Sequence, residues 1–237
     1  MTALPPETPR VAALARYPVK SMRGEPCEAL DLEPRGVVGD RSWAAYCPDG
    51  GIGSGKTTRR FRRVDGLLDH RAVLRGAVPE IEFADGRWLR ADDPAAAARL
   101  SDALGRPLAL RPESDVRHHD ESPVHVVTTA GLRALAALLG EPLDPERFRA
   151  NVVLEVPGTG FVEDAWIGRE LLLGGDVVLR VDGGMPRCRM VDLAQADLPR
   201  DGRILKTLGT RPGVTFGLTA SVLRGGTVHR GDPARLR

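Results

Sequence analysis

Short runs of apolar and β-branched residues, separated at close intervals by glycine and proline, dominate this sequence of 237 residues. With 27 glycines and 19 prolines, the chain is interrupted too often for long helices or a repeated strand–helix pattern. This pattern is typical of a mainly β protein of the α+β class, built as a barrel or sandwich with a few packing helices. Turn sequences such as Asp85-Gly86 join neighbouring runs into hairpins. Residues 11–19 and 42–47 are predicted strands, and residues 81–90 and 171–181 are predicted hairpins.

Two segments carry the helical signals that the rest of the chain lacks. Asp92-Asp93-Pro94 precedes residues 95–104, and Thr128-Thr129 precedes residues 130–139, whose leucines fall on one face. Each segment ends at a glycine, as helices commonly do. Between them, residues 111–121 are polar and irregular, and they are the best candidate for a boundary between two parts of the chain.

Composition excludes several functional classes. A net charge of +2 and a pI near 8.6 are too mild to indicate nucleic-acid binding. No apolar run approaches the roughly 20 residues that a membrane span requires, and residues 1–7 lack the basic and apolar regions of a signal peptide. The three cysteines have no CxxC spacing, which argues against a structural zinc site, and their odd number argues against a disulfide framework. We therefore expect a cytoplasmic protein that works in a reducing setting, without nucleic acid or membrane.

One stretch is similar to a nucleotide-binding loop. Residues 50–57, Gly-Gly-Ile-Gly-Ser-Gly-Lys-Thr, match the Walker A pattern, in which backbone amides, a lysine and a helix N-terminus cradle phosphates. Four arginines follow within residues 59–63, and they do not provide the apolar face that a P-loop helix packs on its sheet. We therefore disfavour a nucleoside triphosphatase. A basic loop that contacts some anion and a plain solvated loop both remain open.

Cys188 stands out because it lies between Arg187 and Arg189, directly after a Gly-Gly-Met-Pro bend. Guanidinium groups beside a thiol favour the thiolate, which attacks electrophiles and binds soft metals. The alternative is a small hydrophobic residue that opens a half-buried strand, with both arginines in solvent. Cys27 and Cys47 match no functional pattern, and we expect both to be packing residues.

Six short motifs follow one another in register from about residue 11 to residue 232. They are Tyr17-Pro18-Val19-Lys20-Ser21, Gly39-Asp40-Arg41, Ser122-Pro123-Val124-His125, Arg147-Phe148-Arg149-Ala150-Asn151, Phe161-Val162-Glu163-Asp164-Ala165-Trp166 and Arg187-Cys188. Together they resemble the MOSC family, which is named after the C-terminal part of molybdenum cofactor sulfurases. The resemblance implies a MOSC β-barrel over residues 116–237. It also implies an N-terminal β-rich module over residues 1–115, whose strands can complete the barrel.

The resemblance further implies a molybdenum cofactor, a pterin whose dithiolene holds the metal and whose phosphate is anionic. In the reductase branch of the family the cysteine of the Arg-Cys motif ligates molybdenum; Cys188 occupies that position, with Arg187 as its positioning residue. From the sequence alone we also place Lys56 and Arg59 in the basic cleft that would hold the phosphate of this cofactor, because guanidiniums and helix N-termini are suitable phosphate sites. The family's cofactor contacts map to Lys20, Ser21, Arg41, Thr128 or Thr129, Arg149 and Asn151.

Three functions are compatible with these residues. The first is a molybdenum-dependent oxidoreductase that reduces small N-hydroxylated compounds. It would take electrons from a separate ferredoxin- or flavoprotein-like donor, because this chain has no Cys-x4-Cys-x2-Cys run for an iron–sulfur cluster. The second is a sulfur carrier, in which a cysteine desulfurase loads a persulfide on Cys188 for transfer to the cofactor or another acceptor. The third is a cofactor-binding module without turnover of its own.

Other conspicuous residues have simpler explanations. The adjacent His118 and His119 would point in different directions on any regular element, so we expect surface residues rather than metal ligands. Glu163, Asp164 and Trp166 lie in an acidic segment that we expect to be a loop. We predict that it forms a structural turn, pairing with an arginine and packing an aromatic ring.

Overall fold

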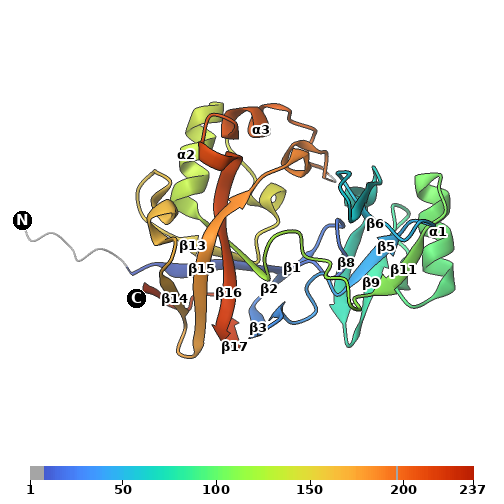
Figure 1. Cartoon of the computed structure of the whole chain (residues 1–237), viewed down its shortest axis with the longest axis horizontal. Helices are drawn as coiled ribbons and strands as arrows, with labels where there is room; N and C mark the ends of the chain where they lie inside the picture. Colours follow the sequence, from blue (N-terminus) through green and yellow to red (C-terminus); the bar gives the residue numbers. More distant parts are fainter. Residues whose placement is uncertain (1–7, 196) are drawn as a thin grey trace, which may run out of the picture.

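The computed structural model describes residues 8–195 and 197–237, which form two lobes side by side (Figure 1). The larger lobe contains an eight-stranded sheet with two helices above it, and the smaller lobe packs one helix on short strands. Strands predominate over helices, which confirms the α+β, mainly β class. The stretch 1–7, from which we predict the absence of a signal peptide, lies outside the described residues. Within those residues, no helix is both long and apolar enough to cross a bilayer.

The eight-stranded sheet combines strands from both ends of the chain. Among the described residues it does not close into a full barrel, because its first and last strands form no ladder with each other. The two ends nevertheless approach through a bridge between Arg10 and Pro233 and a 2.9 Å hydrogen bond from Val11 N to Asp232 O. In spatial order the strands are β18 (Ala234–Leu236), β14 (Glu170–Leu173), β15 (Val177–Pro186), β16 (Thr215–Arg224), β12 (Val124–Thr128), β13 (Val152–Glu155), β1 (Arg10–Arg16) and β2 (Glu25–Cys27).

A small three-stranded sheet covers the same core. Leu30 and Leu32 of β3 (Ala29–Glu33) are buried while their neighbours along the strand are exposed, the alternation expected for a strand with one solvated face. β3 pairs with β4 (Gly36–Val37) on one side and with β17 (Gly226–His229) on the other. The leucines of β3 pack in one cluster with the eight-stranded sheet. Residues near the N-terminus therefore complete the core of the C-terminal lobe.

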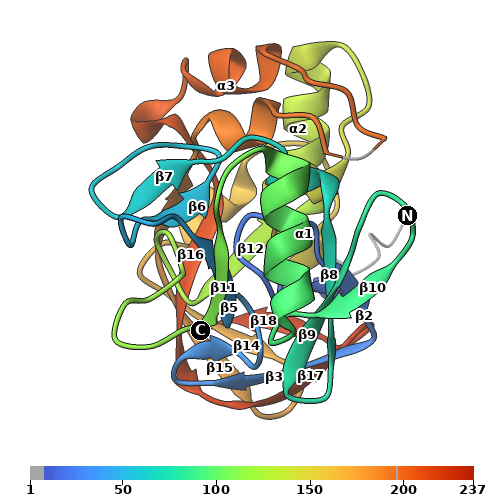
Figure 2. The same cartoon turned by 90° about the vertical axis from the view of Figure 1, so that its right-hand side faces the viewer.

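The smaller lobe consists of two short sheets and one helix with a separate core. Figure 2 shows the helix, α1 (Pro94–Leu104), lying across these strands. The Asp93 side chain accepts a hydrogen bond from Ala95 N at its start, and Gly105 ends it with φ 63°, as the sequence predicts. A 3₁₀ turn spans Leu67–Asp69. The strands are β5 (Trp43–Tyr46), β6 (Ile52–Ser54), β7 (Phe61–Arg63), β8 (Arg71–Arg75), β9 (Val78–Glu82), β10 (Trp88–Arg90) and β11 (Ala109–Pro112).

Two helices and several 3₁₀ turns lie over one end of the large sheet (Figure 1). Thr128 caps α2 (Thr129–Leu139) by accepting a hydrogen bond from Gly131 N, and Gly140 ends that helix. Leu135 of α2 packs in one cluster with Phe148 and Phe216. The remaining elements are α3 (Arg203–Leu208) and 3₁₀ turns at Pro145–Phe148, Val162–Trp166, Arg189–Asp192 and Pro212–Val214.

Some local predictions are wrong. The basic composition and flanking glycines of residues 202–211 predict a turn, but the segment contains α3, because Ile204 and Leu208 are four residues apart and bury one face of a helical turn. The segment 161–166 is a 3₁₀ helix rather than a loop. Cys188 does not open a strand; it follows β15 and precedes the 3₁₀ turn Arg189–Asp192.

The prediction that His118 and His119 lie at the surface is also wrong. His118 is fully buried, with its ring nitrogens 2.9 Å from Arg41 O and 2.8 Å from the Tyr46 hydroxyl. His119 is 8% exposed, and its Nε2 is 3.7 Å from Asp40. The partners of His118 come from residues more than 70 positions earlier in the chain, which residue order alone does not reveal.

The resemblance to a nucleotide-binding loop has no counterpart in the fold. Residues 52–54 form β6 and pair in parallel with β7, and no helix begins in residues 55–63. A P-loop requires a helix whose N-terminus faces the phosphates. The structure therefore agrees with the sequence argument against a nucleoside triphosphatase.

Candidate functional site

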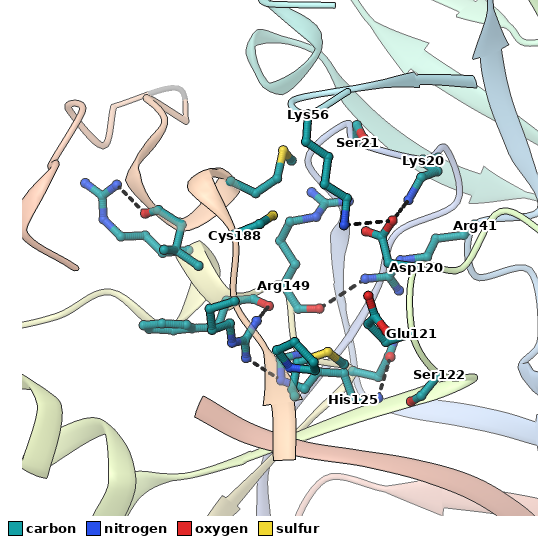
Figure 3. A pocket seen from close by; sticks show the side chains of 18 residues that line it. Lys20, Ser21, Arg41, Lys56, Asp120, Glu121, Ser122, His125, Arg149 and Cys188 are labelled. Atoms are coloured by element: carbon teal, nitrogen blue, oxygen red, sulfur yellow. Dashed lines mark hydrogen bonds and ion pairs between the residues drawn. The ribbon is translucent and has the colours of Figure 1, made fainter. Parts of the chain in front are cut away.

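A cavity with about 720 Å³ of space free of protein atoms, partly open to solvent, lies between the two lobes. Figure 3 shows side chains converging on it from three parts of the chain. The N-terminal part contributes Lys20, Ser21, Arg41 and Lys56, the connecting stretch contributes Asp120, Glu121 and Ser122, and the larger lobe contributes His125, Arg149, Asn151, Arg187 and Cys188.

Lys20 and Lys56 form the cationic wall on the side of the smaller lobe. Their ammonium nitrogens lie 3.1 Å and 3.5 Å from the same carboxylate oxygen of Asp120 (Figure 3). Lys20 is only 2% exposed and its nitrogen is 4.5 Å from the centre of the Phe61 ring. Burial lowers the pKa of Lys20 to about 8, although Asp120 raises it. Holding this lysine charged at neutral pH therefore depends on nearby negative charge.

Arg41 and Arg149 meet at the bottom of the cavity. The Arg41 guanidinium pairs with Asp40 and donates to Arg149 O at 3.3 Å. Arg149 donates to the carbonyl oxygen of Met22, and its guanidinium carbon lies 4.4 Å from the Tyr17 ring centre. Burial would raise the pKa of Asp40, but Arg41 and His119 outweigh it and hold that pKa well below its usual range. Burial lowers the pKa of Arg149, and the charge of Arg41 lowers it further.

Backbone strain is concentrated at this cavity. Among the described residues, four that are not glycine have positive φ, and three of them line the cavity: Ser21 (63°), Arg41 (50°) and Arg149 (54°). A residue with a side chain enters this region at a cost, and such residues cluster at functional sites. The fold therefore sets these three side chains in positions that their local sequence does not favour.

Arg187, directly before Cys188, is half-buried and held by several hydrogen bonds. Its guanidinium donates to the carbonyl oxygens of Phe216, at 2.8 Å from Nε, and Phe148, at 3.2 Å from Nη1. Its Nη2 is 2.5 Å from His125 Nε2. Because a guanidinium only donates, Nε2 of His125 must accept and the imidazole must be neutral. Burial and the charge of Arg187 lower the pKa of His125 well below its usual value, which agrees with this assignment.

The loop that carries Cys188 is held by Arg147 from below. Cys188 is half-buried and lines the cavity, at the end of β15. Arg147 donates to the carbonyl oxygens of Leu193, at 3.3 Å, and of Pro199, at 2.6 Å. Arg189 does not face the cavity and lies 4.0 Å from Asp65. Only one of the two arginines that flank the thiol therefore points inward.

The charge of the cavity walls is unbalanced. Two carboxylates, of Asp120 and Glu121, face six cationic side chains. Arg149 and Arg187 have hydrogen bonds to carbonyl oxygens and His125 rather than to carboxylates. Such a site favours a ligand with several negative charges, because an anion would relieve the cost of burying these cations. The cations are Lys20, Arg41, Lys56, Arg147, Arg149 and Arg187.

The structure brings most of the predicted site residues together. Thr128 and Thr129 do not line the cavity: Thr128 caps α2 and donates to Glu163 at 2.7 Å, and Thr129 donates to Val156 O at 3.2 Å. Arg59 does not line it either. The residues at its wall are Lys20, Ser21, Arg41, Lys56, Arg149, Asn151, Arg187 and Cys188.

Sequence reasoning misses Asp120, His125 and Arg147 as parts of this wall. Asp120 lies in the irregular stretch 111–121, where no pattern marks it. His125 and Arg147 belong to motifs quoted above, and their place in those motifs is the one signal that could have found them. Asn151 is at the wall, but its amide is used within the fold, accepting from His125 N at 3.2 Å and donating to Ala15 O at 3.3 Å.

Comparison with known proteins supplies two family matches and several matching solved structures. A search of curated proteins finds no match. The crystal structure of the YuaD protein from Bacillus subtilis has a similar fold, with a TM-score of 0.56 and 15% identity over 98% of this chain and 97% of that one. The match to the crystal structure of YiiM from Geobacillus stearothermophilus has a TM-score of 0.37 and 18% identity. It covers 49% of this chain and 54% of the YiiM chain.

The family matches cover nearly all of the described chain. Residues 8–103 match the MOSC N-terminal beta barrel domain. Residues 113–235 match the MOSC domain, and they include Cys188 and the larger lobe's part of the cavity. The MOSC family is associated with molybdenum cofactor-binding proteins. The chain belongs to the MOSC domain family.

Proposed function

We propose that this protein binds the molybdenum cofactor in the cavity between its lobes and reduces N-hydroxylated compounds. The observation that carries the proposal is the excess of buried and half-buried cations around a half-buried thiol. A pterin phosphate supplies the missing negative charge, and a thiolate is a ligand that suits a sulfur-rich metal centre. The donor set therefore fits the group.

Each wall residue has a role in this proposal. Lys20, Lys56 and Arg149 hold the anionic part of the cofactor, and Arg41 supports Arg149 through its hydrogen bond to Arg149 O. Cys188 holds the molybdenum. Arg187, fixed by its hydrogen bonds to Phe216 and Phe148, sets the position of the chain next to Cys188. Ser21 and Asn151 complete the wall between these groups.

The bound cofactor would supply two-electron chemistry at its metal. Overall, an N-hydroxyl group takes up two electrons and two protons, its N–O bond breaks, an N–H bond forms and water leaves. The electrons come from a separate ferredoxin- or flavoprotein-like donor, since this chain has three cysteines in all. These cysteines are free thiols, as expected in the reducing cytoplasm, where we place the reaction.

The exposure of Cys188 also suits a second function, that of a sulfur carrier. A half-buried thiol at a cavity mouth can be reached by a cysteine desulfurase, which would load a persulfide on it for transfer to the cofactor or another acceptor. In that case the cavity would hold the acceptor rather than a resident cofactor. A cofactor-binding module without turnover is the third possibility.

Metal analysis of purified protein, expressed with cofactor supply, tests the proposal. We expect about one molybdenum per chain in wild type and in Cys27→Ser, the matched control, and a loss of most metal in Cys188→Ser. Benzamidoxime with an artificial electron donor should then give benzamidine. Metal without product would identify the binding module. A persulfide on Cys188 without bound molybdenum would favour the sulfur carrier, and equal metal in wild type and Cys188→Ser would overturn the assignment of Cys188.

A further inference from the structure

A second cavity adjoins the first, and apart from Ser21 it contains none of the residues to which we assign the cofactor. It has about 700 Å³ of space free of protein atoms, partly open to solvent, and shares two wall residues, Ser21 and Met190, with the first. Met190 follows Cys188 by two residues. The two cavities are therefore neighbours on either side of the loop that begins at Cys188.

The wall of the second cavity is apolar and its rim is charged. Leu67 and Leu68, which are buried, line it together with Leu193. At the rim, Asp65 accepts hydrogen bonds from Arg63 at 2.9 Å and lies 4.0 Å from Arg189. Asp69 is the second carboxylate of the lining, and three guanidiniums, those of Arg63, Arg189 and Arg200, outnumber the two carboxylates. An apolar body that carries a negative group matches both features.

The partition between the cavities is tightly packed. A Cβ added to Gly55 would lie 2.2 Å from Met190 Sδ and 2.8 Å from Leu193 Cδ1, so residue 55 touches the loop that follows Cys188. This close approach gives the glycine of the Walker-like stretch a structural reason that involves no nucleotide. The Met190 side chain is unbranched and flexible, which suits a partition that moves when a ligand enters.

We propose that the second cavity is the substrate pocket of this protein, a proposal that rests on the proposed function. Its substrate is an N-hydroxylated compound with a planar apolar body and an anionic substituent. The apolar body lies against Leu68 and Leu193, the anionic group lies at Arg189 and Arg200, and the N-hydroxyl end points past Met190 toward the cavity of Cys188.

Binding of two probes, measured by titration calorimetry on the full protein as purified, tests this proposal. The probes are benzamidoxime and 4-carboxybenzamidoxime. We expect wild type to bind the carboxylated probe at least tenfold more tightly. Arg200→Glu should remove most of this preference, and the exposed Arg235→Glu should leave it intact. Ala194→Trp, which fills the cavity from an exposed position, should weaken both probes at least tenfold, whereas Ala77→Trp should not.

Metal content separates the two proposals. Ala194→Trp should retain the molybdenum content of wild type, because Ala194 does not line the first cavity. If Ala194→Trp binds both probes like wild type, the second cavity is not the substrate pocket, whatever the metal content. If molybdenum is absent from wild type, the proposed function fails, while the probe titrations still decide whether this cavity binds such compounds.

Discussion

The ammonium nitrogen of Lys20 lies 3.1 Å from a carboxylate oxygen of Asp120, although the two residues are 100 positions apart in the sequence. Lys20 belongs to the N-terminal part of the chain and Asp120 to the connecting stretch. Lys56 contacts the same oxygen at 3.5 Å. Asp120 is itself anchored by Arg60, which donates to its backbone carbonyl oxygen at 3.2 Å. One carboxylate thus serves as the internal counter-charge of two lysines at the mouth of the cavity.

Replacing Asp120 by asparagine should destabilise the protein at pH 7. The change leaves Lys20 buried beside Arg41 and Arg149 without its counter-charge. We expect a loss of about 1–2 kcal/mol, less than for a fully buried pair because the Asp120 side chain is 35% exposed and partly screened. Urea denaturation measures the loss, with the exposed Asp115→Asn as control. Equal stability of wild type and Asp120→Asn would show that solvent, not Asp120, balances Lys20.

The lowered pKa of Lys20 predicts a rise of stability with pH. Between about 8, the folded value, and 10.5, the ordinary value, the folded state binds fewer protons than the unfolded state. The free energy of unfolding should therefore increase with pH in this window, by at most about 1.4 kcal/mol per pH unit from this group. Lys20→Met removes the titration, so the difference between wild type and variant should grow in favour of wild type from pH 8 to 10.

A control separates this effect from the titration of other groups. Lys206 is exposed, and Lys206→Met should give a nearly flat difference from wild type over the same pH range. Urea denaturation at pH 8, 9 and 10 provides the three curves. Parallel curves for wild type and Lys20→Met would mean that Lys20 titrates in the folded state as it does in the unfolded chain.

Local signals in the sequence account for the helices with caps and for the alternating strands. The caps at Asp93 and Thr128, and the glycines that end both helices, predict α1 and α2. α3 is missed because the segment reads as basic, although Ile204 and Leu208 have helical spacing. N-terminal residues join the sheet of the larger lobe because β1 pairs with β13, and a pairing across about 140 residues leaves no local trace.

Most of the candidate site can be found in the sequence only through the family motifs. Lys20 and Arg149 are identified by their place in those motifs, whereas Cys188 also stands out by its flanking arginines and Lys56 by its basic loop. The left-handed conformation of Ser21, Arg41 and Arg149 could not be predicted, because tertiary contacts impose it on residues that ordinarily avoid it. Asp120 belongs to an irregular stretch, and only the folded chain shows that it lies between two lysines.

His125 should be essential for the position of Arg187. In His125→Leu the Arg187 Nη2 loses one of its two acceptors and keeps the carbonyl oxygen of Phe216 at 2.6 Å, so we expect a cost of about 1 kcal/mol. We also expect iodoacetamide to modify Cys188 at a rate at least several-fold different from wild type, because the chain next to the thiol is no longer fixed. Mass spectrometry follows the reaction, with Cys47, which is buried, as internal reference.

The conservative variant is the control for this prediction. His125→Gln can place an amide oxygen near the position of Nε2 and accept from Arg187. It should recover most of the stability and the alkylation rate of wild type. A His125→Leu protein with wild-type stability and alkylation rate would show that Arg187 is held by the carbonyl oxygens of Phe216 and Phe148 alone.

Gly55→Ala should disturb the partition between the two cavities. The new methyl group would overlap Met190 Sδ and Leu193 Cδ1, so these side chains must move. We expect a loss of about 1–2 kcal/mol in the free energy of unfolding. Gly175→Ala is the matched control, since a Cβ there meets no atom within 4 Å and its φ is not positive. Equal stability of both variants would show that the Met190 side chain moves aside without lowering the free energy of unfolding.

Glu163→Gln should stabilise the protein above neutral pH. Glu163 is 1% exposed; its Oε2 accepts from Thr128 at 2.7 Å, while Oε1 has no partner in the described part of the chain. Burial raises its pKa above 4.5, so the folded state binds more protons than the unfolded state above that pH. The contribution of Glu163 to the free energy of unfolding therefore falls as pH rises through its pKa in the folded state. Glutamine does not titrate, so the variant avoids this loss.

We expect Glu163→Gln to exceed wild type by about 1 kcal/mol at pH 8 and to approach it near pH 4.5. Urea denaturation at both pH values measures the difference, and the exposed Glu155→Gln serves as control, with no pH-dependent gain. A variant that is less stable than wild type at pH 8 would mean that the charged carboxylate is needed. In that case the acidic segment 161–166 has a role beyond the structural turn that we predict, because a buried charge kept at a cost to stability is typical of a functional group.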